Sequence, residues 1–295
     1  VHNRAFENFV YAGIEAYASI MQEKDKMLKS NLRKVAMEDF AFAKHRFDSL
    51  SFNDLSSIGG GGDHAAMASN SQYMANISFA ASMLYKLTGD AYYAGEAANA
   101  IRYTLSCQRT EPLKDKDKLR GFFYRDQNKK SIVHYTHQSR DQVYMQALTM
   151  LCETQPNHAD YNKWKESIRL YGDYLKTIMQ YVQPYGMVPS GVYQIDEVKD
   201  SVNFYKVQVG VFRGADKDYK EQLENGVKLD KEHYLRVFPV WFSFKGNAAV
   251  HLSTGKAAAL AGKFLNDKEL INIAEQQLFW IVGKNPFGQS IIWGE

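Results

Sequence analysis

Cysteine is scarce in this chain, which argues against a fold stapled by disulfides. Only Cys107 and Cys152 occur among the 295 residues, and each lies in a stretch with helical periodicity. Two cysteines without a histidine cluster satisfy no common zinc pattern. We therefore expect two buried thiols, and cysteine usage leaves the cellular compartment undecided.

Long apolar runs and a strong charge of one sign are also missing. No apolar stretch approaches the roughly 20 residues that a membrane span needs, so we expect no membrane-spanning segment. The net charge is +3, and no basic tract is longer than a few residues, which argues against nucleic acid as a partner. The eight histidines show no metal-ligand spacing, so we expect neither a metal nor a cofactor.

The composition is otherwise that of an ordinary globular protein. Hydrophobic residues make up 45% of the sequence and charged residues 23%, with no break in composition. We therefore expect one domain over residues 1–295. Aromatic residues reach 14%, which fits a large helical core better than the alternative, a sugar-stacking surface. The chain begins at Val1 with no signal-like segment, so we expect a piece of a longer protein.

Apolar residues recur every three or four positions along most of the chain, which predicts helices. The helices form four hairpins with short turns: 6–21 with a segment ending near 47, 74–84 with 93–101, 143–151 with 161–182, and 248–265 with 270–282. Long loops lie at 49–65, 109–137, 185–232 and 283–295. This alternation predicts an all-α ring of hairpins with its long loops on one face. We expect small β decorations, a hairpin at 121–135 and a short strand at 207–212.

The most informative segment follows the last predicted helix. It reads Gly283-Lys284-Asn285-Pro286-Phe287-Gly288-Gln289-Ser290, in which glycine and proline end the helix and a turned loop presents polar and aromatic groups. The segment resembles the G-x-N-P-x-G-R-S loop of the family 9 glycoside hydrolases, which are mostly cellulases. This resemblance implies an incomplete (α/α)6 toroid, inverting hydrolysis of O-glycosidic bonds in a polysaccharide or oligosaccharide, and a secreted or periplasmic location.

The chain departs from that family where catalysis is concerned. The family uses a D-A-G-D motif as base and a glutamate beyond the Asn-Pro loop as acid, and neither has a match here. The resemblance thus implies a glycoside hydrolase in the intact protein whose catalytic carboxylates are outside this chain. Asp141 matches the first residue of a family Asp-Glu pair, Gln142 replaces the second, and Gln289 in place of arginine favours a glycan other than cellulose.

Two alternatives stay open. The first is a polysaccharide lyase on the same toroid, in which a histidine or tyrosine abstracts a proton and an arginine neutralises a uronate. The second is a glycan-binding module without catalysis. Fold alone does not choose among the three.

Candidate substrate-binding residues group around one polar cluster. It consists of His134, Tyr135, His137, Arg140 and Asp141, and it fits either a glycan subsite or a helix-start network in which Asp141 suits the helix dipole. The remaining candidates have alternatives as helix caps, loop or core residues. They are Asp63 and His64 behind four glycines, Trp241 in an aromatic run, and Asn285, Trp293 and Glu295 at the predicted cleft rim.

The arginine of this cluster provides a first test. Arg140→Ala in the full-length protein is expected to weaken glycan affinity or raise KM, by about 1.5–3 kcal/mol if the guanidinium makes a charged hydrogen bond. The melting temperature should change little. An unfolded variant with unchanged residual affinity would make Arg140 structural, and loss of a turnover that yields an unsaturated uronate would favour the lyase.

Overall fold

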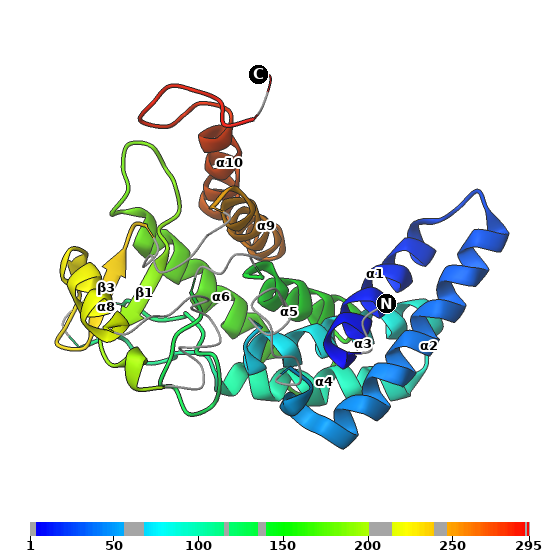
Figure 1. Ribbon diagram of the computed structural model, residues 1–295. Helices are drawn as coiled ribbons and strands as arrows, with labels where there is room; N and C mark the ends of the chain where they lie inside the picture. The colour runs from blue at the N-terminus through cyan, green and yellow to red at the C-terminus, as the bar shows by residue number, and fades with distance from the viewer. Residues whose placement is uncertain are drawn as a thin grey trace. The chain divides into compact units, whose positions relative to one another are not determined.

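The computed structural model describes residues 4–55, 68–114, 118–134, 140–200, 214–238, 247–292 and 294 (Figure 1). Two compact units divide the chain. Unit 1 comprises Val1–Ser106 and Gln146–Lys165, and unit 2 comprises Cys107–Met145 and Glu166–Glu295. The single domain expected from composition stays a prediction. Within the described residues, no helix has the length and apolarity to cross a membrane.

Unit 1 begins with an antiparallel helical hairpin, α1 (Ala5–Met21) and α2 (Lys26–Leu50). The turn is held by side chains, because Gln22 accepts the backbone N–H groups of Lys24 and Asp25, both at 3.1 Å. Asp25 then caps α2 by accepting the Leu28 N–H at 2.9 Å. This hairpin confirms the first predicted pair.

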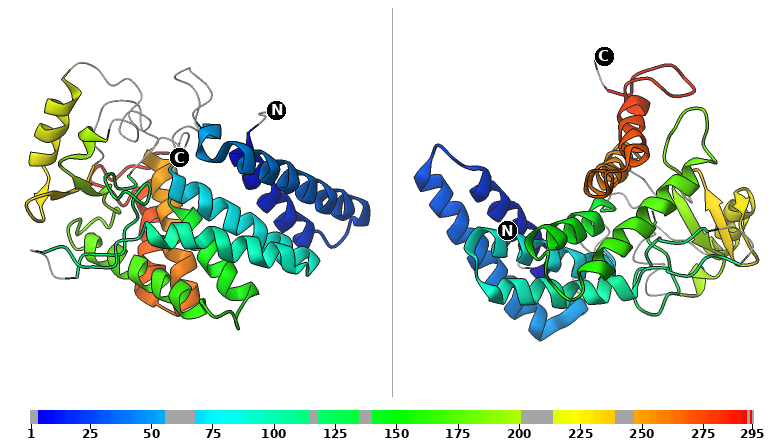
Figure 2. Two further views of the ribbon diagram at one scale, coloured as in Figure 1. Left: turned by 90° about the horizontal axis from the view of Figure 1, so that it is seen from below. Right: turned by 180° about the vertical axis from the view of Figure 1, so that it is seen from behind.

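A second hairpin in unit 1 joins α3 (Asn70–Thr88) to α4 (Ala91–Ser106), and Figure 2 shows its antiparallel course. Ser69 and Gln72 form a capping box at the start of α3, and Gly89 ends it in the left-handed region at φ 75°. Asp90 accepts the Tyr92 N–H at 2.9 Å to begin α4. The predicted glycine and aspartate signals at this turn are thus confirmed.

Aromatic rings fill the core between these helices. Phe9 of α1 lies 5.3 Å from Phe40 of α2, and Phe40 lies 5.3 Å from Tyr93 of α4, both edge to face. Phe6 meets Tyr73 of α3 at 5.2 Å. The abundance of aromatic residues therefore serves packing here, as expected.

The third predicted hairpin appears as α5 (Gln142–Thr154) and α6 (Tyr161–Met179). The fourth is α9 (Asn247–Leu265) and α10 (Lys268–Ile281), which pack side by side in unit 2. Asp267 caps α10 by accepting the N–H of Leu270 at 3.2 Å and also binds Lys176 of α6 at 2.8 Å. One turn residue therefore starts α10 and ties it to α6.

A small antiparallel sheet in unit 2 takes two strands from the predicted loop 185–232 and one from the residues just after it. Its strands are β1 (Gly191–Gln194), β2 (Val227–Lys228) and β3 (His233–Arg236), in the order β1-β3-β2. Helix α8 (Ala215–Glu224) covers it, with Tyr219 and Leu223 against Tyr193 and Tyr234. The sequence prediction missed these elements because short strands far apart in sequence leave a weak periodic signal. The strand expected at 207–212 lies outside the described residues.

The predicted hairpin around 121–135 is present as single β-bridges rather than strands. Tyr124 pairs with Ile132, the Arg125 N–H donates to the Ser131 carbonyl at 2.8 Å, and the Val133 N–H donates to the Phe123 carbonyl at 2.9 Å. The all-α class with small β decorations is thus confirmed in the described residues. Helical hairpins are the building unit of the toroid that the resemblance implies, and the gathering of the long loops on one face stays a prediction.

Two glycines give a matched test of this packing. Gly121 has φ 101°, and an added Cβ would collide with the backbone carbonyl of Leu170, whereas Gly89 has φ 75° and open space around it. Gly121→Ala should therefore lower the free energy of unfolding by more than about 3 kcal/mol. Gly89→Ala should cost only about 1 kcal/mol, the strain of the left-handed backbone. Urea denaturation of both variants checks this, and equal losses would contradict the packing described at Gly121.

Candidate functional site

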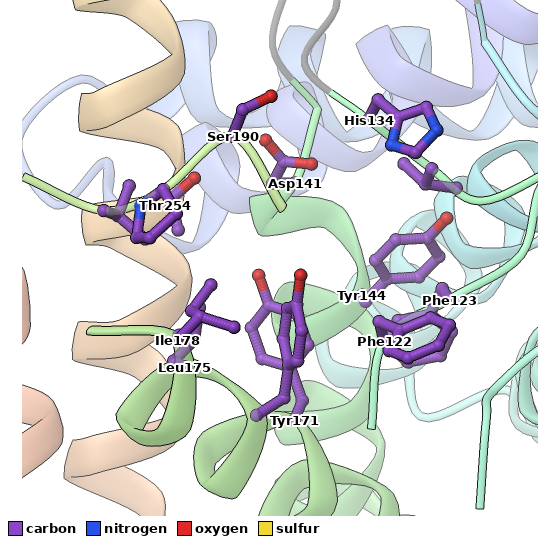
Figure 3. Close-up of a pocket in the computed structure, with 14 residues that line it drawn as sticks. Phe122, Phe123, His134, Asp141, Tyr144, Tyr171, Leu175, Ile178, Ser190 and Thr254 are labelled. Carbon is purple, nitrogen blue, oxygen red and sulfur yellow. The ribbon is translucent and has the colours of Figure 1, made fainter. Parts of the chain in front are cut away.

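A small pocket with polar and aromatic lining lies in unit 2, where five parts of the chain meet (Figure 3). The bridged hairpin contributes side chains from both of its arms, among them Phe123 and His134. Helix α5 begins at the edge of the pocket, α6 supplies two tyrosines, and α9 supplies Thr254. The segment before β1 adds Ser190. The cavity measures about 40 Å³. One water needs roughly 10–15 Å³ of such volume, so the pocket holds a few waters or a hydroxyl group and not a sugar ring.

Asp141 lies at this pocket, directly before α5. Two adjacent side chains tie this helix start to α9, because Asp141 is hydrogen-bonded to Thr254 and Gln142 to Ser253. Burial raises the pKa of Asp141 to about 7, although the Thr254 hydrogen bond acts in the opposite direction. The residue as a whole is partly exposed, and its side chain lines the cavity. A carboxylic acid that titrates near neutral pH can donate or accept a proton.

Aromatic side chains form the opposite wall. Phe123 stacks on Tyr144 with centroids 4.0 Å apart, and in Figure 3 the hydroxyl of Tyr171 points toward the side of the pocket where Asp141 lies. Burial raises the pKa of Tyr171 and of Tyr174 well above the ordinary tyrosine range, and the nearby Asp141 carboxylate adds to the shift. Both phenols therefore keep their protons at neutral pH.

His134 forms the pocket edge next to the hairpin and is only 6% exposed. Its Nε2 lies 2.6 Å from Oε2 and 2.8 Å from Oε1 of Glu197, which is 3% exposed. Its ring stacks on Tyr193 with centroids 3.7 Å apart and planes 8° from parallel. The Tyr193 hydroxyl in turn lies 2.6 Å from the Ser190 hydroxyl. These contacts fix the imidazole in one orientation.

A hydrogen-bonded segment shapes the wall that carries Ser190. Gln277 of α10 is fully buried, donates to the Gly186 carbonyl at 2.9 Å and accepts the Val188 N–H at 2.8 Å. The Ser190 N–H then donates to the Val237 carbonyl at 2.9 Å. This wall is thus held at both ends by groups with satisfied hydrogen bonds.

Of the residues predicted from the sequence, the pocket brings together His134 and Asp141. Arg140 is half-buried beside them, and its carbonyl accepts the Val143 N–H at 3.2 Å. Its contact with a glycan stays a prediction. The other candidates lie outside the described residues: Tyr135, His137, Asp63, His64, Trp241, Trp293 and Glu295.

Asn285 organises the Asn-Pro loop from within. Its side-chain nitrogen donates to the carbonyls of Trp280 at 2.9 Å and Gln289 at 2.8 Å, and its oxygen accepts the Phe287 N–H at 3.1 Å. The side chain is buried. Asn285 therefore has a structural role, because its hydrogen bonds hold the loop together. A contact between Asn285 and a sugar stays a prediction.

Sequence reasoning missed Glu197, Ser190 and Thr254. None stands in a motif, and Glu197 comes 63 residues after the histidine it binds. Wider hollows of unit 2 are lined by surface charges, such as the one of about 520 Å³ beside Arg169 and Lys176, but both cations are paired with carboxylates. Across the described ranges, no three His, Cys, Asp or Glu side chains gather as a metal site would require. Cys107 and Cys152 are buried free thiols, as expected.

Comparison with known proteins gives structural similarity only. No family model and no curated protein sequence matches the chain. The crystal structure of the cellulase Cel9M of C. cellulolyticum aligns with 99% of this chain and 68% of its own, at 15% identity and a TM-score of 0.33. A second structure of Cel9M, in complex with cellobiose, aligns with 98% of this chain and 66% of its own, at 14% identity and a TM-score of 0.32.

The titration of Asp141 sets a pH dependence of stability. The folded chain keeps a proton that the unfolded chain releases, so the Asp141 contribution to stability falls as the pH rises from about 4 to about 7. Asp141→Asn removes this loss and should stabilise the chain at pH 8 by about 1–2 kcal/mol. This is less than the free energy that corresponds to the whole pKa shift, because Asp141 is partly exposed to solvent. Thermal melts between pH 4 and 8 measure it. A variant that is less stable at pH 8 than the wild type would contradict the buried carboxyl.

Proposed function

We propose that the chain is a carbohydrate-active domain whose unit 2 pocket binds a hydroxyl group of a glycan. The observation that carries this proposal is the make-up of the pocket. Carboxyl and hydroxyl groups of Asp141, Thr254 and Ser190 lie along one side, and aromatic rings such as Tyr144 along the other. Sugars present the same two chemistries, hydroxyl groups and apolar C–H faces, and aromatic rings pack against the latter.

The size of the cavity fixes how a sugar would be held. A volume of about 40 Å³ is far below the roughly 300–1,000 Å³ of a pocket that encloses a whole ligand. The glycan would therefore lie outside and insert one hydroxyl or hydroxymethyl group. A group that displaces water from such a cavity gains affinity when it reproduces the hydrogen bonds of that water.

Hydrolysis of O-glycosidic bonds is the reaction we propose for the intact protein, by the resemblance of the Asn-Pro loop. Inverting hydrolysis needs two carboxyl groups roughly 6.5–9.5 Å apart. In the described residues, Asp141 is the carboxyl group that lines the pocket. Neither family motif that carries a catalytic carboxyl group has a match in the chain, so both catalytic groups are proposed to lie outside it, and Asp141 is proposed to bind the glycan rather than to cleave it.

A lyase is the second candidate, and the buried His134–Glu197 pair is the observation that favours it. An imidazole oriented by a carboxylate is a common general base. Proton abstraction next to a uronate carboxylate would leave an unsaturated product that absorbs in the ultraviolet. This product separates the two reactions directly.

The binding role is tested by variants on one helix. Thr254→Val removes a hydroxyl of α9 without changing the side-chain shape, and it should weaken binding of cellotetraose or xylotetraose by about 0.5–1.5 kcal/mol in calorimetry. Lys263→Ala, on the exposed side of the same helix, is the matched control and should bind as the wild type does.

The 295-residue chain should release no sugar from these oligosaccharides, since hydrolysis requires two carboxyl groups and neither family motif that supplies them has a match in the chain. Absence of binding to every neutral and acidic tetrasaccharide tried would refute the carbohydrate role. Turnover far above background would show that both catalytic groups lie within the chain.

A further inference from the structure

His134 carries a buried nitrogen with no hydrogen-bond partner among the described residues. This atom is Nδ1, on a side chain that is 6% exposed and lines the pocket. In Figure 3 one ring nitrogen of His134 faces the side of the pocket on which Asp141 lies. A buried nitrogen of this kind ordinarily has a partner, either a water or a ligand. The pocket is where that partner would be.

Glu197 decides which proton the imidazole carries. Its carboxylate can only accept, so Nε2 of His134 holds a proton and donates it across 2.6 Å. The carboxylate cannot turn away easily, because it also accepts the backbone N–H of Gln194 at 2.9 Å and of Ile132 at 3.3 Å. In the neutral ring Nδ1 is then an acceptor. Stacking on Tyr193 fixes the plane of the ring.

Asp141 supplies the complementary group. It lines the same cavity of about 40 Å³ as His134. As a carboxylic acid, Asp141 has one O–H to donate. A hydroxyl group is both donor and acceptor, so it can satisfy His134 and Asp141 together.

We propose that His134 Nδ1 and the protonated Asp141 carboxyl form a recognition site for one uncharged hydroxyl group, with Glu197 as the residue that positions His134. The ligand hydroxyl donates to Nδ1 and accepts from the Asp141 O–H. This inference rests on the glycan-binding role proposed above and names the group of the sugar that the site recognises. A carboxylate group has no proton to give to Nδ1, so it cannot take the place of that hydroxyl group.

The site should lose its donor in alkaline solution. The groups that face Asp141 are Tyr144 of α5, Tyr171 and Tyr174 of α6, Thr254 of α9 and His134. Burial keeps the protons on Tyr171 and Tyr174, as described above. Above pH 7 the Asp141 carboxyl becomes an acceptor only, and the ligand hydroxyl can no longer bond both partners at once.

The test combines histidine ¹⁵N NMR with calorimetry on the 295-residue chain. In the wild type, His134 should be protonated at Nε2 and not at Nδ1, and glycerol or cellotetraose should shift the Nδ1 resonance. Glu197→Gln should mix the two tautomers, because an amide can donate as well as accept, and should weaken cellotetraose binding about tenfold. Glu232→Gln, an exposed glutamate of unit 2, is the matched control and should change neither.

Two further variants keep the result interpretable. His134→Phe preserves the ring stacked on Tyr193 but removes Nδ1, and it should also bind about tenfold more weakly. Asp141→Asn keeps a donor at every pH, so its affinity should stay constant from pH 6 to 9 while the wild-type affinity falls at least fivefold.

Failure of this inference and failure of the proposed function give different results. If cellotetraose binds but Nδ1 does not shift, and Glu197→Gln and His134→Phe bind normally, the inference is wrong and the glycan role stands. If no tetrasaccharide binds while glycerol still shifts Nδ1, the hydroxyl site stands and the glycan role is wrong. A wild-type His134 protonated at Nδ1 would overturn the inference outright.

Discussion

The carboxylate of Glu197 is the constraint on which the unit 2 site depends. It is almost fully buried, and a buried charge costs several kcal/mol unless it is paired and hydrogen-bonded. Glu197 meets this cost with the Nε2–H of His134 and two backbone N–H groups. The buried guanidinium of Arg125 adds a nearby positive charge. These bonds clamp the hairpin that carries His134 to the segment that follows β1.

A second set of polar contacts places the other half of the pocket. The start of α5 is held against α9 by Asp141 with Thr254 and by Gln142 with Ser253. Removing Asp141 from water raises its pKa to about 7, so the same burial that fixes its position also sets its protonation. A strained or destabilised group of this kind is typical of functional sites, since packing alone would favour an uncharged residue. Position and chemistry at this site are therefore not independent.

The helices could be predicted from the sequence because their signals are local. Gly89 and Asp90 mark a turn, and the three- and four-residue apolar spacing marks the faces that pack. The sheet could not be predicted, because β1 and β3 are separated by about 40 residues and each strand is only four residues long. Asp141 and His134 stood out as a polar cluster near one helix start. Glu197 did not stand out, because its bond to His134 forms only when folding brings together two residues that are 63 positions apart.

The central claim is that the pocket receives one hydroxyl group of a glycan between His134 and Asp141. A crystal structure of the chain with cellotetraose, grown near pH 6, tests it most directly. The account predicts one sugar hydroxyl within hydrogen-bond distance of both His134 Nδ1 and the Asp141 carboxyl, with Glu197 still bound to Nε2. A sugar bound elsewhere with only water in the pocket, or an imidazole rotated away from Glu197, would contradict it.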